Sequence, residues 1–290
     1  MATSFSVLLQ YLLPKQALTR FAGFVARSEW GGITHAIIRW FVCRYGVNMA
    51  EAVQTDPVAY KSFNAFFTRA LKPSARPLAP AAFVCPVDGA ISQLGRIERD
   101  QIFQAKGHRY STQTLVGGDA ALAAQFQDGD FATIYLSPKD YHRIHMPTAA
   151  RLRRMIHVPG DLFSVNPVTA QGVPGLFARN ERVVCEFDAP HGADGTLRPF
   201  VLVLVGATIV GSMSTVWHGV VNPPRPGHLR EWTYDDKALR FERGQEMGSF
   251  LLGSTVVMLW PQDTIAFNPQ WAPSQPVRLG EAMGELFIPL

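Results

Sequence analysis

The chain has 290 residues, of which 47% are hydrophobic and 17% charged, so it can bury a sizeable core and is not a disordered protein. Its 24 glycines and 21 prolines follow no period, which excludes a collagen-like or linker architecture. The three cysteines form no CxxC pair, so we expect neither a disulfide scaffold nor a zinc ribbon, and a reducing compartment fits best.

The net charge of +4 is concentrated in the first fifty residues. Five of the 27 basic and one of the 23 acidic side chains lie there, which leaves 22 of each sign in residues 51–290. Short apolar helices that carry arginine and tryptophan are typical of segments lying on an anionic membrane surface. Apolar side chains recur at helical spacing in this segment, in two sets: Leu18, Phe21 and Val25, then Ile33, Ile37, Trp40 and Phe41.

Residues 1–50 are therefore predicted to form basic, amphipathic helices that associate with a membrane. The uncharged run that ends at Pro14 is shorter than the about 20 residues needed to span a bilayer. No basic leader precedes that run, so a secretory signal is not expected. The alternative is that these helices pack on the rest of the protein and that their arginines are simply solvated.

The remainder of the chain divides into a connector and a β-rich region. Residues 51–80 are predicted to be the connector, with a helix over 60–71 and a proline-rich stretch over 72–80. From about residue 83, short β-type runs alternate with turn dipeptides such as Asp-Gly and Gly-Gly. The expected strands include residues 131–136, 182–187, 200–210 and 254–260, and one helix is expected over 118–126. The predicted fold class is α+β, with a mostly antiparallel β domain over residues 81–290 and helices at the N-terminus.

Three separated clusters could carry chemistry. Asp88 stands between an apolar run and a glycine, where the residue alone indicates a turn cap. His142 and His145 follow a predicted strand and could be metal ligands, acid–base groups or exposed loop residues. No cysteine or acidic side chain is spaced to complete a metal site, so none is expected. Ser254 follows Gly253 at the entry to a strand, where the simplest interpretation is a bend.

The Gly253-Ser254 bond also has a chemical interpretation. Glycine has no side chain to hinder attack on its carbonyl, and the neighbouring hydroxyl is close to that carbonyl. A phosphate-binding glycine loop, an HExxH motif and a GxSxG motif are all absent from the sequence.

In this order and at these distances, the three clusters resemble the phosphatidylserine decarboxylases, which are pyruvoyl-dependent membrane enzymes. The similarity extends over roughly residues 60–285, and the basic, apolar N-terminus is also typical of the bacterial enzymes. Further blocks that resemble the family are residues 63–69, 71–73, 76–77, 135–138, 164–167, 176–182, 205–207, 211–213 and 244–248.

The resemblance implies that the protein cleaves itself between Gly253 and Ser254. His145 would be the base and Asp88 its orienting carboxylate, as in a Ser-His-Asp triad directed at the protein's own backbone. Ser254 would become a covalent pyruvoyl group, which serves as the cofactor and binds the substrate amine as a Schiff base. The products would be a β chain of residues 1–253 and an α chain of residues 254–290 that stay associated. By the same resemblance, His142 would be the proton donor in decarboxylation, with an ordinary pKa near 6.5.

The implied reaction is decarboxylation of phosphatidylserine to phosphatidylethanolamine. The expected partner is an anionic phospholipid membrane rather than nucleic acid, and the expected location is the cytoplasmic face of the inner membrane, as a peripheral protein. Three alternatives remain open: a serine hydrolase that uses Ser254, His145 and Asp88 without self-cleavage, a self-processing decarboxylase of another head group, and a non-enzymatic β module. The sequence also leaves open whether the chain forms a homodimer.

Overall fold

A long antiparallel sheet forms the centre of the protein. The computed structural model describes residues 5–192, 195–208, 212–251 and 254–288. Nine strands form the central sheet in the order β12-β7-β8-β9-β15-β5-β2-β17, with β13 paired to β7. Their bounds are β2 Gly89–Arg96, β5 Asp130–Leu136, β7 Ala150–Val158, β8 Arg182–Pro190, β9 Leu197–Val205, β12 Arg230–Thr233, β13 Arg240–Phe241, β15 Ser254–Trp260 and β17 Pro276–Val277.

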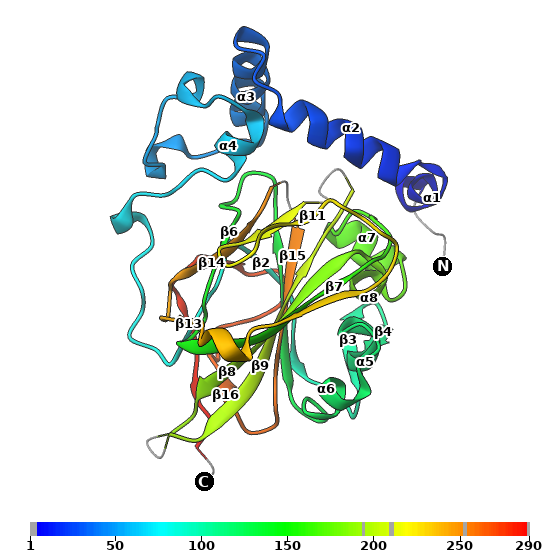
Figure 1. The fold of residues 1–290 in the computed structure, drawn as a ribbon, viewed down its shortest axis with the longest axis vertical. Helices are drawn as coiled ribbons and strands as arrows, with labels where there is room; N and C mark the ends of the chain where they lie inside the picture. Colours follow the sequence, from blue (N-terminus) through cyan, green and yellow to red (C-terminus); the bar gives the residue numbers. More distant parts are fainter. Residues whose placement is uncertain (1–4, 193–194, 209–211, 252–253, 289–290) are drawn as a thin grey trace.

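Smaller sheets and short helices complete the β domain (Figure 1). The strands of these sheets are β1 Phe83–Val84, β18 Ala282–Leu286 and β16 Ile265–Phe267; β11 Gly219–Asn222, β10 Met213–Thr215, β14 Glu246–Phe250 and β6 Arg143–His145; β3 Gln101–Ala105 and β4 His108–Ser111. The helices on one side of the domain are α5 Thr112–Leu115, α6 Ala120–Ala124, α7 Pro167–Gly172 and α8 Leu176–Arg179.

The central strand β15 divides the interior into two hydrophobic cores. Every one of its seven residues is buried, because β5 and β9 flank it and side chains cover both faces of the sheet. Val256, Met258 and Trp260 face one core, and Val257 and Leu259 face the other, as expected for the two-residue period of a strand. Ser254 is the first residue of this strand, so its backbone position is fixed by the most buried part of the sheet.

The N-terminal helices lie across one end of the β domain (Figure 1). They are α1 Phe5–Leu12, α2 Lys15–Arg27 and α3 Gly32–Tyr45, and Gly46 ends α3 in a left-handed conformation at φ 65°. Several large apolar side chains of α2 and α3 face solvent, with Phe21 68%, Ile33 60% and Trp40 61% exposed. Among the described residues, no helix is both long and apolar enough to cross a membrane.

The predicted α+β class with a mostly antiparallel β domain is confirmed. The expected strands over 131–136, 182–187 and 254–260 are present, and α6 lies inside the expected helix over 118–126. The strand expected over 200–210 ends at Val205, and residues 209–210 of that expectation lie outside the described residues.

The helix expected over residues 60–71 is wrong in length, because α4 covers only Phe63–Phe67. The side chain of Ser62 accepts a hydrogen bond from the Ala65 amide, so Ser62 is the N-cap of the helix that begins at Phe63. The hydroxyl of Thr68 binds the Asn64 carbonyl at the other end, and Leu71 then pairs with Ala52 in an isolated β bridge. Local caps and a tertiary contact therefore shorten a segment whose apolar spacing favours a longer helix.

Candidate active site

Ser254 lies at the start of β15, opposite Leu136 of β5. The residue is 1% exposed, and its hydroxyl has no hydrogen-bond partner among the described residues. A buried hydroxyl without a partner is unusual, since buried polar groups are nearly always satisfied. Gly253, the predicted partner in cleavage, lies outside the described residues.

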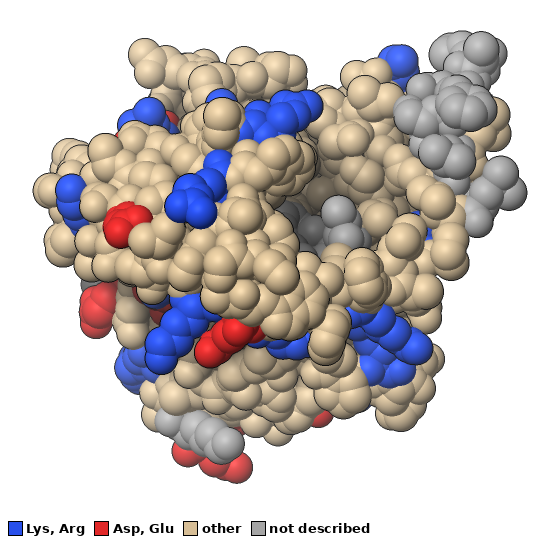
Figure 2. All heavy atoms as spheres, turned by 90° about the horizontal axis from the view of Figure 1, so that it is seen from above, with Lys and Arg blue, Asp and Glu red and all other residues tan. Residues whose placement is uncertain are grey.

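Ser254 lines an apolar cavity of about 610 Å³ between the N-terminal helices and the end of the central sheet. Figure 2 shows that this face of the protein is hollowed and that its visible charged side chains are mainly Lys and Arg. The apolar lining from the helices is Phe21, Val25, Ile37, Trp40, Phe41, Phe63 and Phe67. The cavity therefore connects the exposed apolar faces of α2 and α3 with the buried hydroxyl of Ser254.

Contacts at both ring nitrogens orient the imidazole of His145. Nδ1 lies 2.8 Å from the Gly244 carbonyl oxygen, which can only accept, so Nδ1 carries the proton and Nε2 is the basic nitrogen. The Tyr141 hydroxyl lies 3.1 Å from Nε2 and donates to it in this tautomer. Burial lowers the pKa of His145, and the Gly244 contact opposes that effect. His145 is therefore a neutral imidazole in position to accept a proton.

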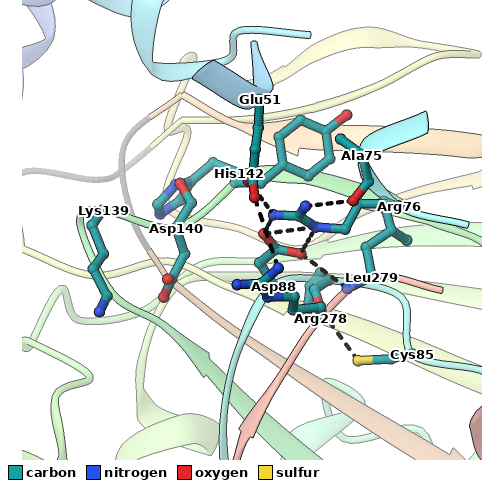
Figure 3. Close-up of polar contacts among 12 residues, drawn as sticks. Glu51, Ala75, Arg76, Cys85, Asp88, Lys139, Asp140, His142, Arg278 and Leu279 are labelled. Carbon is teal, nitrogen blue, oxygen red and sulfur yellow. Dashed lines mark hydrogen bonds and ion pairs between the residues drawn. The ribbon is translucent and has the colours of Figure 1, made fainter. Parts of the chain in front are cut away.

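Asp88 is buried and bound by an arginine (Figure 3). Its carboxylate accepts hydrogen bonds from the Arg76 guanidinium and, 2.9 Å away, from the Leu279 amide. Arg76 also donates to Glu51, so one guanidinium joins two carboxylates. The Arg76 guanidinium comes from the connector, between residues 51 and 80, and not from the β domain itself.

The structure brings Asp88 near His145 without a direct bond. The His145 amide donates to the Pro86 carbonyl at 2.9 Å, which places the loop before Asp88 beside β6. The charge of Asp88 is one of the lesser influences that raise the pKa of His145. Among the described residues, no hydrogen bond joins any two of Asp88, His145 and Ser254.

His142 is fully buried beside the cavity that contains Ser254. Its Nδ1 donates to the Asp140 carbonyl at 2.8 Å, and its ring packs on Phe67 with centroids 4.0 Å apart. Nε2 has no hydrogen-bond partner among the described residues. Burial lowers the pKa of His142 to about 3, well below the ordinary value near 6.5 that the sequence alone predicts. His142 is therefore neutral here, and its Nε2 starts as an acceptor.

Sequence reasoning missed Arg76, Tyr141 and Phe67 as neighbours of the predicted site residues. Tyr141 stands directly before His142, and a phenol four residues from His145 was the available signal. Arg76 and Phe67 lie in blocks that resemble the family, but nothing in the sequence relates them to Asp88 or His142. The expectation of no metal site was made from spacing alone; the described residues contain no group of three His, Cys, Asp or Glu that could hold an ion.

Comparison with known proteins identifies the family. A relative from Methylibium petroleiphilum, named phosphatidylserine decarboxylase proenzyme, is 71% identical over 290 residues, which is 100% of both chains. Relatives with the same name from Variovorax paradoxus and Azoarcus sp. are 72% identical over 281 residues and 67% identical over 287 residues, with at least 97% of each chain covered. A family model described as PSD matches residues 5–46. The model described as phosphatidylserine decarboxylase matches residues 63–285, and the chain belongs to this family.

Proposed function

We propose that this protein is a phosphatidylserine decarboxylase that makes its own pyruvoyl group by cleavage between Gly253 and Ser254. The buried, unpartnered hydroxyl of Ser254 at the base of an apolar cavity is the observation that carries the proposal. Membership of the family and relatives named as proenzymes support both the activity and the self-processing. The enzyme class is a carbon–carbon lyase that acts on the serine head group.

Self-cleavage begins with proton transfer from the Ser254 hydroxyl. His145 Nε2 is the basic nitrogen available for that proton, either directly or through the Tyr141 hydroxyl that covers it. The Ser254 oxygen then bonds to the Gly253 carbonyl carbon, and the peptide C–N bond breaks to leave an ester and a free amine. The ester leaves as the carboxylate of Gly253 when a proton is lost from the α carbon of Ser254. Water then displaces the nitrogen of residue 254, which leaves as ammonia, and the α chain is left with a pyruvoyl group as its first residue.

Asp88 acts in this step through its charge. Its negative charge favours the imidazolium that His145 becomes after it takes the Ser254 proton. Arg76 and the Leu279 amide hold the carboxylate in place while this happens. In the proposed triad, Asp88 therefore acts electrostatically, and the Gly244 carbonyl orients the imidazole.

The surroundings of Ser254 fit a pyruvoyl group. The side chain has no hydrogen bond to lose among the described residues, and it borders a cavity large enough for substrate. A pyruvoyl group supplies an electron sink for the charge left when carbon dioxide departs. Because β15 is paired with both β5 and β9, the α chain is expected to stay in the sheet after cleavage.

His142 is proposed to manage the proton of decarboxylation. Its Nε2 is neutral and unpartnered among the described residues, so it must take up a proton before it can give one. The substrate ammonium carries protons that it has to lose before its nitrogen can react. The His142 ring packs on Phe67, which lines the cavity, and its Nε2 is the proposed acceptor of one of these protons. The same proton can then be returned to the carbon that lost carbon dioxide.

The N-terminal helices are proposed to hold the protein on the cytoplasmic face of the inner membrane as a peripheral protein. Their solvent-exposed apolar side chains and their net positive charge support contact with an anionic leaflet. The cavity lining from α2 and α3 would then place the acyl chains of phosphatidylserine next to the site.

Replacing both Phe21 and Trp40 with serine should weaken binding to phosphatidylserine-containing vesicles by more than about tenfold, because each large apolar side chain contributes about 1.5–3 kcal/mol when buried. Vesicle co-sedimentation measures this, and self-cleavage should be little changed. Deletion of residues 1–45 should likewise weaken vesicle binding far more than it affects self-cleavage. Leu197→Ser is the matched control, since Leu197 is 53% exposed at the hairpin that joins β8 to β9, away from the helices. Unchanged vesicle binding by the double variant would contradict the membrane contact.

The proposed function is tested by the denatured mass of the purified protein. We expect two species, residues 1–253 and residues 254–290, with the shorter one lighter by one ammonia than a chain that begins with serine. Hydroxylamine should add to the short species and stop decarboxylation, whereas a serine-directed phosphonate should not react. A single uncut species that reacts with the phosphonate would instead support a serine hydrolase.

A further inference from the structure

Arg69 is a buried cation that forms no ion pair with an acidic side chain of the described residues. The residue is 4% exposed, and among the described residues its side-chain hydrogen bonds are two long ones from Nη2, to the carbonyls of Lys139 and Asp140 at 3.2 and 3.4 Å. Nε and Nη1 have no partner among the described residues. The buried Arg182 differs, since all three of its nitrogens donate to backbone carbonyls. A guanidinium left in this state is costly unless an anion arrives to pair with it.

Arg69 lines a second cavity, of about 510 Å³, which carries more cations than anions. The three acids of its lining are already engaged: Glu51 and Asp88 bind Arg76, and Asp140 accepts from the amide and hydroxyl of Ser137. Figure 3 shows Glu51 and Asp88 on either side of the Arg76 guanidinium. Within the part of the chain that the structure describes, no carboxylate forms an ion pair with Arg69, and Asp88 and Asp140 act on it only through their charge at longer range.

The two cavities adjoin. Tyr135 lines both of them, and the segment that contains α4 contributes to each: Phe63 and Phe67 face the cavity of Ser254, whereas Arg69 faces the second one. The charge of Arg69 also lowers the pKa of His142, so the guanidinium is close to that imidazole. An apolar compartment beside a cationic one matches a ligand that has acyl chains next to a phosphate.

We propose that Arg69 binds the phosphodiester of the substrate head group, an assignment that rests on the proposed function. The substrate also has a carboxylate, but that group leaves as neutral carbon dioxide. An ion pair to it would stabilise the ground state more than the transition state and slow the reaction. The phosphodiester keeps its charge throughout, so pairing with Arg69 strengthens binding without that penalty. Charge-assisted hydrogen bonds from Nε and Nη1 supply the contact.

Binding to the uncleaved Ser254→Ala chain tests this without a pyruvoyl group, so the result does not depend on self-cleavage or activity. Calorimetry compares dihexanoyl phosphatidylserine with O-decylserine, which has no phosphate. Adding Arg69→Met should weaken the phospholipid by about 10–100-fold and O-decylserine by less than about threefold. Lys139→Met is the control, since it removes an exposed cation from the same cavity and should change both affinities by less than about threefold.

Other outcomes overturn the assignment. Equal weakening of both ligands, or no weakening of either, would mean that Arg69 does not recognise the phosphate, as would a Ser254→Ala chain that binds neither ligand. If Arg69→Met abolishes binding of inorganic phosphate but leaves the phospholipid unchanged, the site takes free phosphate instead. The melting temperature of Arg69→Met should be equal or higher, because the change removes a buried unpaired charge. If that variant does not fold, Arg69→Lys should show a smaller loss confined to the phospholipid, and no such loss would overturn the site.

Discussion

Replacing Ser254 with alanine is expected to leave one intact chain of 290 residues and to abolish decarboxylation. The alanine side chain cannot attack the Gly253 carbonyl, and it cannot become a carbonyl group at the start of the α chain. Neither self-cleavage nor decarboxylation should be detectable. Both reactions depend on residue 254, first as the serine that attacks and then as the pyruvoyl group formed from it. Denatured mass measures the first effect, and release of carbon dioxide from phosphatidylserine measures the second.

Ser249→Ala is the matched control for this result. Ser249 is also a buried serine close to the site, on β14, but its hydroxyl is paired with that of Ser214. This variant should cleave itself and decarboxylate at rates within a few-fold of the unmodified protein. A Ser254→Ala chain that still splits, or that still releases carbon dioxide, would refute the assignment of Ser254.

Replacing His142 with alanine should separate the two reactions. Self-cleavage should continue, because His145 is the proposed base for that step, while decarboxylation should fall by about 10²–10⁴-fold through loss of the proton carrier. His145→Asn should instead leave the chain uncut, and without a pyruvoyl group that chain should not decarboxylate either. Parallel measurement of intact mass and carbon dioxide release for both variants distinguishes the two roles.

A second variant at position 142 provides a further control for this comparison. His142→Phe keeps a ring against Phe67 in the same buried site but has no nitrogen to carry a proton. It should therefore fold and cleave normally yet decarboxylate as poorly as the alanine variant. Decarboxylation near the normal rate in either variant would show that His142 does not carry the proton.

The central strands could be predicted because their residue types leave little choice. Residues 254–260 are a run of β-branched and large apolar side chains, and a strand buried on both faces requires such a run. The helix predicted over residues 60–71 is too long for the opposite reason. The side chains of Ser62 and Thr68 bind the backbone at the two ends of α4, and these polar residues are not part of the apolar spacing on which the prediction rests. Caps depend on single side chains, and periodicity does not detect them.

At the candidate site, the sequence motifs indicate which residues are involved, but the charge states and partners of these residues depend on the fold. The motifs indicated Asp88, His142, His145 and Ser254, but the charge state of His142 follows from complete burial, which is a tertiary property. The Arg76–Asp88 pair joins the connector to the β domain, and nothing in the sequence between these two residues indicates that they bind each other. The lack of an ion pair at Arg69 is likewise visible only when the partners of the neighbouring acids are known, Arg76 for Glu51 and Asp88 and Ser137 for Asp140.

The position of β15 has a consequence for how the mature protein can be assembled. Its seven residues pair with β5 on one side and five of them pair with β9 on the other, so the α chain supplies the middle of the main sheet. While the chain is whole, closing that sheet is an intramolecular event. After the cut, an unfolded protein would have to recover a 37-residue partner from solution, and refolding would depend on concentration. The native form would then persist by the slowness of its unfolding.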